Sequence, residues 1–341
     1  MKTHRFLIGS YAENQGIWEL KADLDRQEIF SCRCVSNTRR NSYLALAGEI
    51  CYAVSEVPLA EGSTGKLHSF HVSEQGLEPL DTLEGLPPLL PHLAVNGAGT
   101  VVYTASYGTG DVLAISVSDG KFGPILSHTK NTGSSVDPRR QTCAHPHSVW
   151  LSPDEQFLFL CDLGTDQILS WPLTEAGGLV TERKQTLSVP AGYGPRHMVF
   201  SADGSRAYVI TEMAWHVLEL AVSGREMTLL RDISLEGDIP RQDQGGGAIR
   251  LSRDGKTLFC SNRGKENSRI SVLSTDTMAP CQNLTDCIWP RDFQLSEDGT
   301  FLLCANQTED SLSLFRRNDV GSWEYSRKIT GIPSPVCLVE L

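Results

Sequence analysis

The sequence lacks the segments that would carry a chain into or across a membrane. No apolar run reaches the roughly 18 residues of a membrane-spanning helix, and Met1 to Arg5 lead directly into a strand-like segment without the apolar core of a signal peptide. The net charge of −11 disfavours binding to nucleic acid or to an anionic membrane surface. We therefore expect a cytoplasmic protein without nucleic-acid or membrane partners, either a monomer or a weak homo-oligomer.

Short motifs for disulfides, metals and phosphate loops are also missing. The ten cysteines include no Cys-x-x-Cys pair, so we expect free thiols in a reducing compartment. His145 and His147 are two residues apart, but the ligand spacing of a known metal site is absent, which predicts no metal and no cofactor. Gly245 to Gly247 are not followed by Gly-Lys-Ser/Thr, and no Gly-x-Ser-x-Gly elbow supplies a serine nucleophile.

What the sequence does contain is a β-hairpin motif, clearest between Gly194 and Glu212. Pro195 suits the start of a strand, where a missing N–H is tolerated. Asp203 and Gly204 supply turn chemistry, because Asp bonds back to the backbone and Gly adopts positive φ. The beginning of the first strand and the end of the second lie side by side in such a hairpin. Arg196 and Glu212 are therefore predicted to be neighbours.

The same hairpin recurs along the chain. Four copies share a Ser-x-Asp turn whose Asp residues are spaced 49, 51 and 44 residues apart. These residues are Asp154, Asp203, Asp254 and Asp298. The return strands are predicted at 157–162, 207–212, 257–262 and 301–306, with weaker copies at 50–55 and 101–106. Each copy continues into a third alternating strand and a more degenerate fourth, as one blade of a β-propeller does.

A seventh copy is divided between the two ends of the chain. Residues 5–11 and 16–20 resemble the second and third strands of a blade, and residues 333–341 resemble its first strand. We therefore predict an all-β, seven-bladed β-propeller of four-stranded antiparallel blades, forming one domain over residues 1–341 and closed by the terminal strands. A β-sandwich is the competing interpretation, but strict recurrence of one turn is hard to obtain by chance.

Aligning the copies on their turns places two sets of residues at one rim of the propeller. The first-strand set is Ser42, Pro91, His147, Arg196, Gly247, Arg291 and Ser334, with His92 and His197 close by. The second-strand set is Tyr11, Glu56, Tyr107, Leu163, Glu212, Arg263 and Gln307. Arginine is suited to bidentate capture of carboxylate or phosphate, so this rim predicts a site for an anionic ligand. The alternative is that Arg196 and Arg263 form structural ion pairs between blades with Glu212 and Glu56. Arg139 and Arg140, in the preceding loop, either reach over the rim or are solvated.

The chain resembles a known family, the bacterial 6-phosphogluconolactonases of the seven-bladed lactonase type. Fungal carboxy-cis,cis-muconate cyclases share the fold of this family. The resemblance rests on Gly194-Pro-Arg-His197 with Thr211-Glu212, on Gly133 to Gln141 followed by His145-Pro-His147-Ser, and on Asp162 to Ile168. It covers essentially the whole chain, which differs from the family pattern at Thr211 and at Gly245 to Gly247. The resemblance implies a metal-independent enzyme acting on anionic lactones, with site residues at His147, Arg196, Glu212 and Arg263.

These residues give a mechanistic hypothesis. Glu212 or His147 acts as the general base on water, while Arg196, Arg263, Arg291, His197 and His92 bind the substrate or its developing oxyanion. The predicted reaction is hydrolysis of 6-phosphogluconolactone to 6-phosphogluconate in the pentose phosphate pathway. Two alternatives stay open at this point: a lactone-forming isomerase of the carboxymuconate cyclase type, and a non-catalytic propeller that binds a ligand or a protein.

Overall fold

The computed structural model describes residues 3–58, 64–235, 237, 243 and 245–341. Over these residues the chain is built of β-strands, with two short 3-10 helices, η2 (Thr181–Arg183) and η4 (Gln307–Glu309). Its contacts divide into two compact units, residues 1–44 with 236–341 and residues 45–235. Each unit is described by itself. The expectations of a single domain over 1–341 and of a monomer or weak homo-oligomer stay predictions.

The first unit contains three four-stranded antiparallel sheets. One has the order β28 (Pro335–Glu340), β1 (His4–Ser10), β2 (Ile17–Asp23) and β3 (Glu28–Ser36). The second consists of β20 (Gly246–Leu251), β21 (Thr257–Asn262), β22 (Arg269–Ser274) and β23 (Pro280–Leu284). The third consists of β24 (Pro290–Leu295), β25 (Phe301–Asn306), β26 (Ser311–Arg317) and β27 (Trp323–Thr330).

The second unit contains three complete sheets and most of a fourth, whose first strand begins in the first unit. That fourth sheet consists of β4 (Asn41–Ala47), β5 (Ile50–Ser55), β6 (Gly65–Ser73) and β7 (Gly76–Leu86). The first complete sheet consists of β8 (His92–Val95), β9 (Val101–Ala105), β10 (Asp111–Ser118) and β11 (Lys121–Lys130). The second consists of β12 (Pro146–Leu151), β13 (Phe157–Asp162), β14 (Gln167–Pro172) and β15 (Gln185–Ser188). The third consists of β16 (Pro195–Phe200), β17 (Arg206–Thr211), β18 (His216–Ser223) and β19 (Glu226–Ser234).

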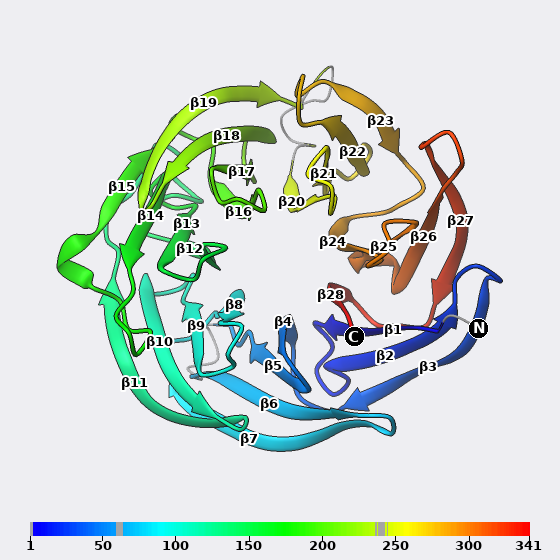
Figure 1. The fold of residues 1–341 in the computed structure, drawn as a ribbon, viewed down its shortest axis with the longest axis horizontal. Coiled ribbons are helices and arrows are strands. Elements are labelled where there is room, and N and C mark those ends of the chain that lie inside the picture. The colour runs from blue at the N-terminus through cyan, green and yellow to red at the C-terminus, as the bar shows by residue number, and fades with distance from the viewer. Residues whose placement is uncertain (1–2, 59–63, 236, 238–242, 244) are drawn as a thin grey trace. The chain divides into compact units, whose positions relative to one another are not determined.

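The divided seventh blade is confirmed by strand pairing. β28 pairs antiparallel with β1, from Phe6 opposite Glu340 to Ser10 opposite Pro335. Figure 1 shows the red β28 beside the blue β1. The two ends of the chain thus share one sheet, in which the last strand covers an edge of β1 that would otherwise expose unpaired backbone groups.

The recurring turn is held by the chemistry that its sequence predicts. In the hairpin of β16 and β17, Ser201 Oγ donates to Asp203 Oδ1 at 2.6 Å, and Gly204 has φ of +71°. The hydrogen bond from Ser201 is the main reason why the pKa of Asp203 is lowered to about 2. The hairpin at Asp154 places Glu155, at φ +55°, where the other copies have glycine. The turn therefore tolerates one strained residue when the serine–aspartate bond is kept.

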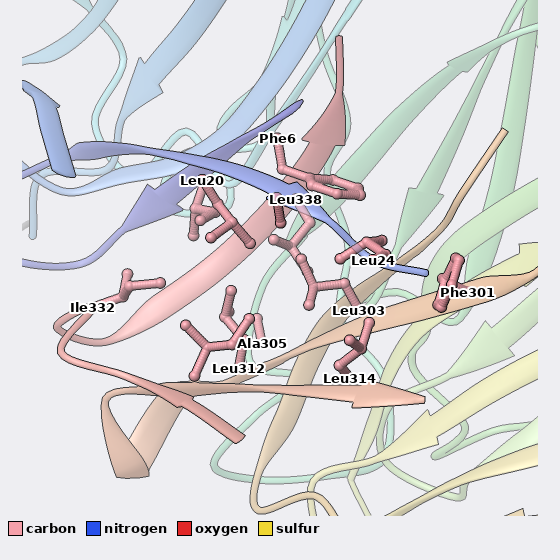
Figure 2. Close-up of a cluster of buried hydrophobic side chains, with 13 residues drawn as sticks. Phe6, Leu20, Leu24, Phe301, Leu303, Ala305, Leu312, Leu314, Ile332 and Leu338 are labelled. Carbon is pink, nitrogen blue, oxygen red and sulfur yellow. The ribbon is translucent and has the colours of Figure 1, made fainter. Parts of the chain in front are cut away.

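The core lies between neighbouring sheets. In the first unit, Phe6, Leu20, Leu303 and Leu338 are each 1% exposed or less and belong to one apolar cluster of 13 buried residues (Figure 2). Alternate residues of β1, β2, β25 and β28 supply these side chains, as expected for strands buried between two layers. Burial of each large apolar side chain stabilises the fold by roughly 1.5–3 kcal/mol.

The inner strands contain a β-bulge that positions polar side chains. Pro146 pairs with Asp162 and Ser148 with Cys161, so that His147 is the extra residue in β12. The same register shift makes Arg196 the extra residue in β16 and Arg291 the extra residue in β24. A bulge bends its strand and redirects a side chain, which is why bulges are frequent beside functional sites.

Two residues of the predicted first-strand set do not lie at a bulged position. Pro91 precedes β8, which pairs with β9 without a register shift. In the sheet of β28, Pro335 pairs with Ser10 and the register shifts after it, which places Val336, and not Ser334, at the bulged position. No Ser-x-Asp turn follows this strand, so the marker that aligns the other copies is absent here. The proline that precedes the bulged residue in β12, β16 and β24 recurs as Pro335 and is the signal that gives the observed register.

Candidate active site

The hairpin of β16 and β17 brings Arg196 and Glu212 together as its sequence predicts. Glu212 follows β17 directly, and its backbone N–H donates to Gly194 O at 2.7 Å. Arg196 Nε donates to Glu212 Oε2 at 3.0 Å. Arg196 is 2% exposed and Glu212 is 8% exposed. A buried guanidinium must be paired to offset its desolvation, so this carboxylate holds Arg196 in place.

A second arginine reaches the same carboxylate from a loop. Arg140 lies in the segment between β11 and β12, and its terminal nitrogen donates to Glu212 Oε1 at 2.5 Å. Its side chain is 47% exposed. Partial burial disfavours the charged guanidinium, but the neighbouring Glu212 carboxylate outweighs this and raises the pKa of Arg140. The two guanidiniums and one carboxylate leave a local charge of +1 (two minus one) in a chain whose net charge is −11.

The Arg140 loop is held by the polar side chains of Asp137 and Gln141. Asp137 Oδ1 accepts the backbone N–H groups of Arg139 and Arg140, at 2.9 and 2.8 Å. These two bonds are the main reason why the pKa of Asp137 is lowered. Gln141 is fully buried, where its amide donates to Leu163 O and its side-chain oxygen accepts from Asp137 N. The loop is therefore ordered by the chain itself, and it presents Arg140 rather than Arg139 to Glu212.

Asp162, the last residue of β13, anchors the end of this loop. Its Oδ1 accepts the backbone N–H groups of His145, Gly164 and Thr165, and its Oδ2 accepts from the side chain of Asn131. Burial raises the pKa of Asp162 against the effect of these four donors. The acid thereby joins both ends of the loop to the turn after β13.

Histidines and one tryptophan pack beside the carboxylate. His147 Nε2 lies 3.7 Å from Glu212 Oε2. The rings of His147 and His197 are 5.3 Å apart between centroids, and those of His197 and His92 are 5.4 Å apart. The rings of Trp150 and His92 are 4.7 Å apart between centroids. The sequence-predicted residues His147, Arg196, His197, His92 and Glu212 thus form one connected cluster in the second unit.

The protonation of His197 follows from its partner. Arg196 Nη1 lies 3.1 Å from His197 Nε2. Because a guanidinium carries only donors, Nε2 of His197 is the acceptor and the ring is neutral, with its proton on Nδ1. His197 thus acts as a polar neighbour that orients Arg196.

Arg263 and Arg291 belong to the first unit, and their contacts are described there. Arg263 Nη2 donates to Gly246 O at 2.9 Å. Arg291 Nη2 donates to the Tyr11 hydroxyl at 2.6 Å, and its guanidinium lies 4.8 Å from the centroid of the Tyr11 ring. Arg40 lies 5.6 Å from the same centroid, so two arginines flank one aromatic ring. The assignment of Arg263 and Arg291 to substrate binding stays a prediction.

Sequence reasoning did not assign Tyr107 or His145 to the site. The Tyr107 hydroxyl accepts from Arg140 at 3.4 Å, and its ring stacks on His145 with 4.3 Å between centroids. Burial raises the pKa of Tyr107, and Arg140 partly opposes this effect. Tyr107 did appear in the second-strand set, which was the available signal. His145 was considered only as a metal ligand.

Among the described residues, no group of three or more His, Cys, Asp and Glu is arranged to hold a metal ion. The described part of the chain also has no helix long and apolar enough to cross a membrane. All ten cysteines are free thiols in the structure.

Comparison with known proteins agrees with this architecture. Residues 5–340 match the family described as "Lactonase, 7-bladed beta-propeller". A protein of Bacillus subtilis (strain 168) named 6-phosphogluconolactonase is 25% identical over 346 residues, covering 97% of this chain and 96% of that protein. A Formosa agariphila protein of the same name is 29% identical over 297 residues, covering 83% of each.

A solved structure shows the same fold. The periplasmic gluconolactonase of Pseudomonas aeruginosa superposes with a TM-score of 0.89 at 26% identity, covering 100% of this chain and 99% of that one. The predicted blade count, the divided blade and the family resemblance are thus confirmed. The chain belongs to the lactonase family of seven-bladed β-propellers.

Proposed function

We propose that the protein hydrolyses 6-phosphogluconolactone to 6-phosphogluconate in the cytoplasm, without a metal ion or cofactor. The observation that carries this proposal is the cluster in which Glu212 is bound by Arg196 and Arg140 and lies beside His147. Membership in a lactonase family supports the reaction class. The two relatives named 6-phosphogluconolactonase support the phosphorylated substrate.

The geometry favours His147 over Glu212 as the general base. Both oxygens of Glu212 accept charge-assisted hydrogen bonds from guanidiniums, which stabilise its negative charge and make it a weak proton acceptor. His147 is 6% exposed, and an imidazole gains and loses a proton near neutral pH. The Glu212 carboxylate, whose Oε2 lies 3.7 Å from His147 Nε2, then stabilises the charged form of the imidazole electrostatically.

The proposed reaction is the hydrolysis of a cyclic ester. A water molecule attacks the lactone carbonyl carbon while His147 takes one of its protons, and the carbonyl oxygen becomes an oxyanion. When the tetrahedral intermediate collapses, the bond to the ring oxygen breaks and the imidazolium returns the proton to that oxygen. Arg140 is the exposed cation of the cluster and is suited to exchange its bond with Glu212 for one with the substrate's phosphate or oxyanion.

The decisive experiment compares three substrates with the purified protein. 6-Phosphogluconolactone, gluconolactone and carboxy-cis,cis-muconate are each followed at pH 7, with spontaneous lactone hydrolysis subtracted by a protein-free blank. Preference for the phosphorylated lactone is expected. An equal kcat/KM for gluconolactone would show that the phosphate group does not contribute to recognition. Formation of a lactone from carboxy-cis,cis-muconate would show that the protein is a cyclase and not a hydrolase. Absence of turnover with all three substrates would contradict both enzymatic proposals and favour a protein that binds a ligand without catalysis.

Independence from metal ions is tested in the same assay. Dialysis against EDTA should leave kcat/KM for 6-phosphogluconolactone unchanged, because the proposed steps use only His147, Glu212 and arginine side chains. Loss of activity on chelation, with recovery on addition of one divalent ion, would contradict this part of the proposal.

A further inference from the structure

The loop that carries Arg140 also carries a cysteine and a histidine with no part in the proposed hydrolysis. Cys143 is exposed, and its Sγ lies 3.6 Å from Nε2 of His145. An exposed thiol in hydrogen-bond contact with an imidazole nitrogen is the arrangement by which cysteine nucleophiles are activated.

The orientation of the imidazole is determined by the backbone. His145 Nδ1 lies 2.7 Å from Tyr107 O, and because a carbonyl only accepts, Nδ1 carries the proton. When the ring is neutral, Nε2 is its acceptor nitrogen, and the thiol of Cys143 donates to it. The Tyr107 ring stacks on the imidazole with an interplanar angle of 15°, and Asp162 fixes the backbone N–H of His145. His145 is thus held with its basic nitrogen facing the sulfur.

We propose that Cys143 and His145 form a peroxide-sensitive modification site. The thiol proton moves to His145 Nε2, and the sulfur attacks one oxygen of hydrogen peroxide. The S–O bond forms as the O–O bond breaks, and the imidazolium gives its proton to the departing oxygen. Cysteine becomes sulfenic acid, a two-electron oxidation, and peroxide is reduced to water. The carbonyl of Tyr107 and the tyrosine ring stabilise the imidazolium during this step.

The chain contains a matched control thiol. Cys281 is the other exposed cysteine, but its Sγ donates to the carbonyl oxygen of Val272 at 3.2 Å. A carbonyl oxygen cannot take the thiol proton, so the sulfur of Cys281 has no base at this contact. The two cysteines therefore share exposure and differ in the hydrogen-bond acceptor.

The modification site is continuous with the candidate active site. Tyr107 contacts His145 through its ring and Arg140 through its hydroxyl, and Arg140 binds Glu212. Oxidation at Cys143 is therefore expected to disturb the position of Arg140 and to lower lactone hydrolysis. This consequence rests on the proposed function, whereas oxidation of the thiol does not.

The test measures sulfenic acid directly. The full-length protein is treated with hydrogen peroxide in the presence of dimedone, which traps sulfenic acids, and labelling at Cys143 and Cys281 is followed by peptide mass spectrometry. Cys143 should be labelled on the order of tenfold faster than Cys281. Equal rates at the two residues in the unaltered protein would overturn the proposal without need of any variant.

A variant at His145 tests whether the imidazole acts as the base, without disturbing the fold. In His145→Asn the side-chain amide still donates to Tyr107 O but has no basic nitrogen near the sulfur. With its melting temperature within a few degrees of the parent, this variant should label Cys143 at the rate of Cys281. An unchanged Cys143 rate in His145→Asn would also overturn the proposal. Labelling that agrees with expectation while lactone hydrolysis is undetectable would reject the proposed function and leave the modification site standing.

Discussion

The Arg196 guanidinium and the Glu212 carboxylate lie 3.0 Å apart within one hairpin, although sixteen residues separate them in the sequence. Two interpretations of Arg196 were open: binding of an anionic ligand, and an ion pair between blades. The pair exists, but inside a single sheet, and the arginine is almost completely buried. Its first role is therefore to position Glu212, and the exposed Arg140 is the better candidate for direct contact with an anion.

Replacing Arg140 should weaken substrate binding with little effect on stability. Its side chain is half exposed, and loss of one charge-assisted hydrogen bond costs about 1.5–3 kcal/mol, or roughly ten- to a hundredfold in KM. Arg140→Lys should recover only part of this, because an ammonium does not reproduce the planar fork. Arg139→Ala is the matched control and should change KM by less than about twofold, since surface substitutions rarely matter. Equal effects of the two alanine variants would refute the assignment.

Substitutions at the buried pair should separate stability from turnover. Arg196→Ala leaves the buried Glu212 carboxylate without its buried guanidinium partner and should lower the free energy of unfolding by about 3–5 kcal/mol. Glu212→Gln keeps the shape and should lower kcat by at least about tenfold, because the amide does not stabilise an imidazolium on His147. Denaturant unfolding and steady-state kinetics on both variants measure these two effects. A Glu212→Gln enzyme with the kcat of the parent would contradict the proposed role of Glu212.

Removing the last strand should strongly destabilise the fold. Deletion of Pro335 to Leu341 removes all of β28, including the buried Val336, Cys337 and Leu338, and exposes the edge of β1. We expect a large fall in melting temperature and a tendency to aggregate. Deletion of Leu341 alone is the control, because this residue is exposed and lies beyond the strand. A truncated protein that melts like the full-length chain would show that the terminal pairing contributes nothing.

A buried histidine should make stability fall in mild acid. His68, in β6, contacts Ser55 Oγ and Thr82 Oγ1 at 3.0 Å each, and burial lowers its pKa from 6.5 to about 4, with a smaller contribution from Lys66. Between these values the unfolded chain binds a proton that the folded chain does not. The contribution of His68 is therefore complete above pH 6.5 and is lost progressively as the pH falls toward 4, amounting to roughly 3 kcal/mol.

The measurement is the free energy of unfolding between pH 4 and 7.5. His68→Gln should flatten this dependence, because glutamine does not titrate in the range. His71→Gln, in the same strand, is the control and should keep the slope of the parent. An identical slope in His68→Gln would assign the acid sensitivity to other groups.

Much of the fold follows from the sequence, because the turn repeats. Strands predicted at 157–162 and 257–262 coincide with β13 and β21, since a Ser-x-Asp turn fixes both the end of one strand and the beginning of the next. Hairpin register also gave the contact of Arg196 with Glu212. Ser334 was misplaced because β28 has no turn after it to fix its register.

The contact of Arg140 with Glu212 could not be predicted in this way. It depends on the path of a loop without repeat or periodicity, and that path is determined by buried polar groups such as Asp162 and Gln141. A sequence pattern shows that such residues are present. It does not show which backbone groups they bind.

The side chain at the bulged position of a first strand is independent of the pairing that builds the sheet. The residue there lies outside the regular pairing of the ladder, so its side chain can be exchanged without changing strand register. Within this one chain the position is occupied by His147, Arg196, Arg291 and Val336, which are a titratable ring, two cations and an aliphatic group. A designer who wished to change what the protein recognises could therefore substitute the bulged residue in each of these four sheets and keep the turns, which set the strand register, unchanged.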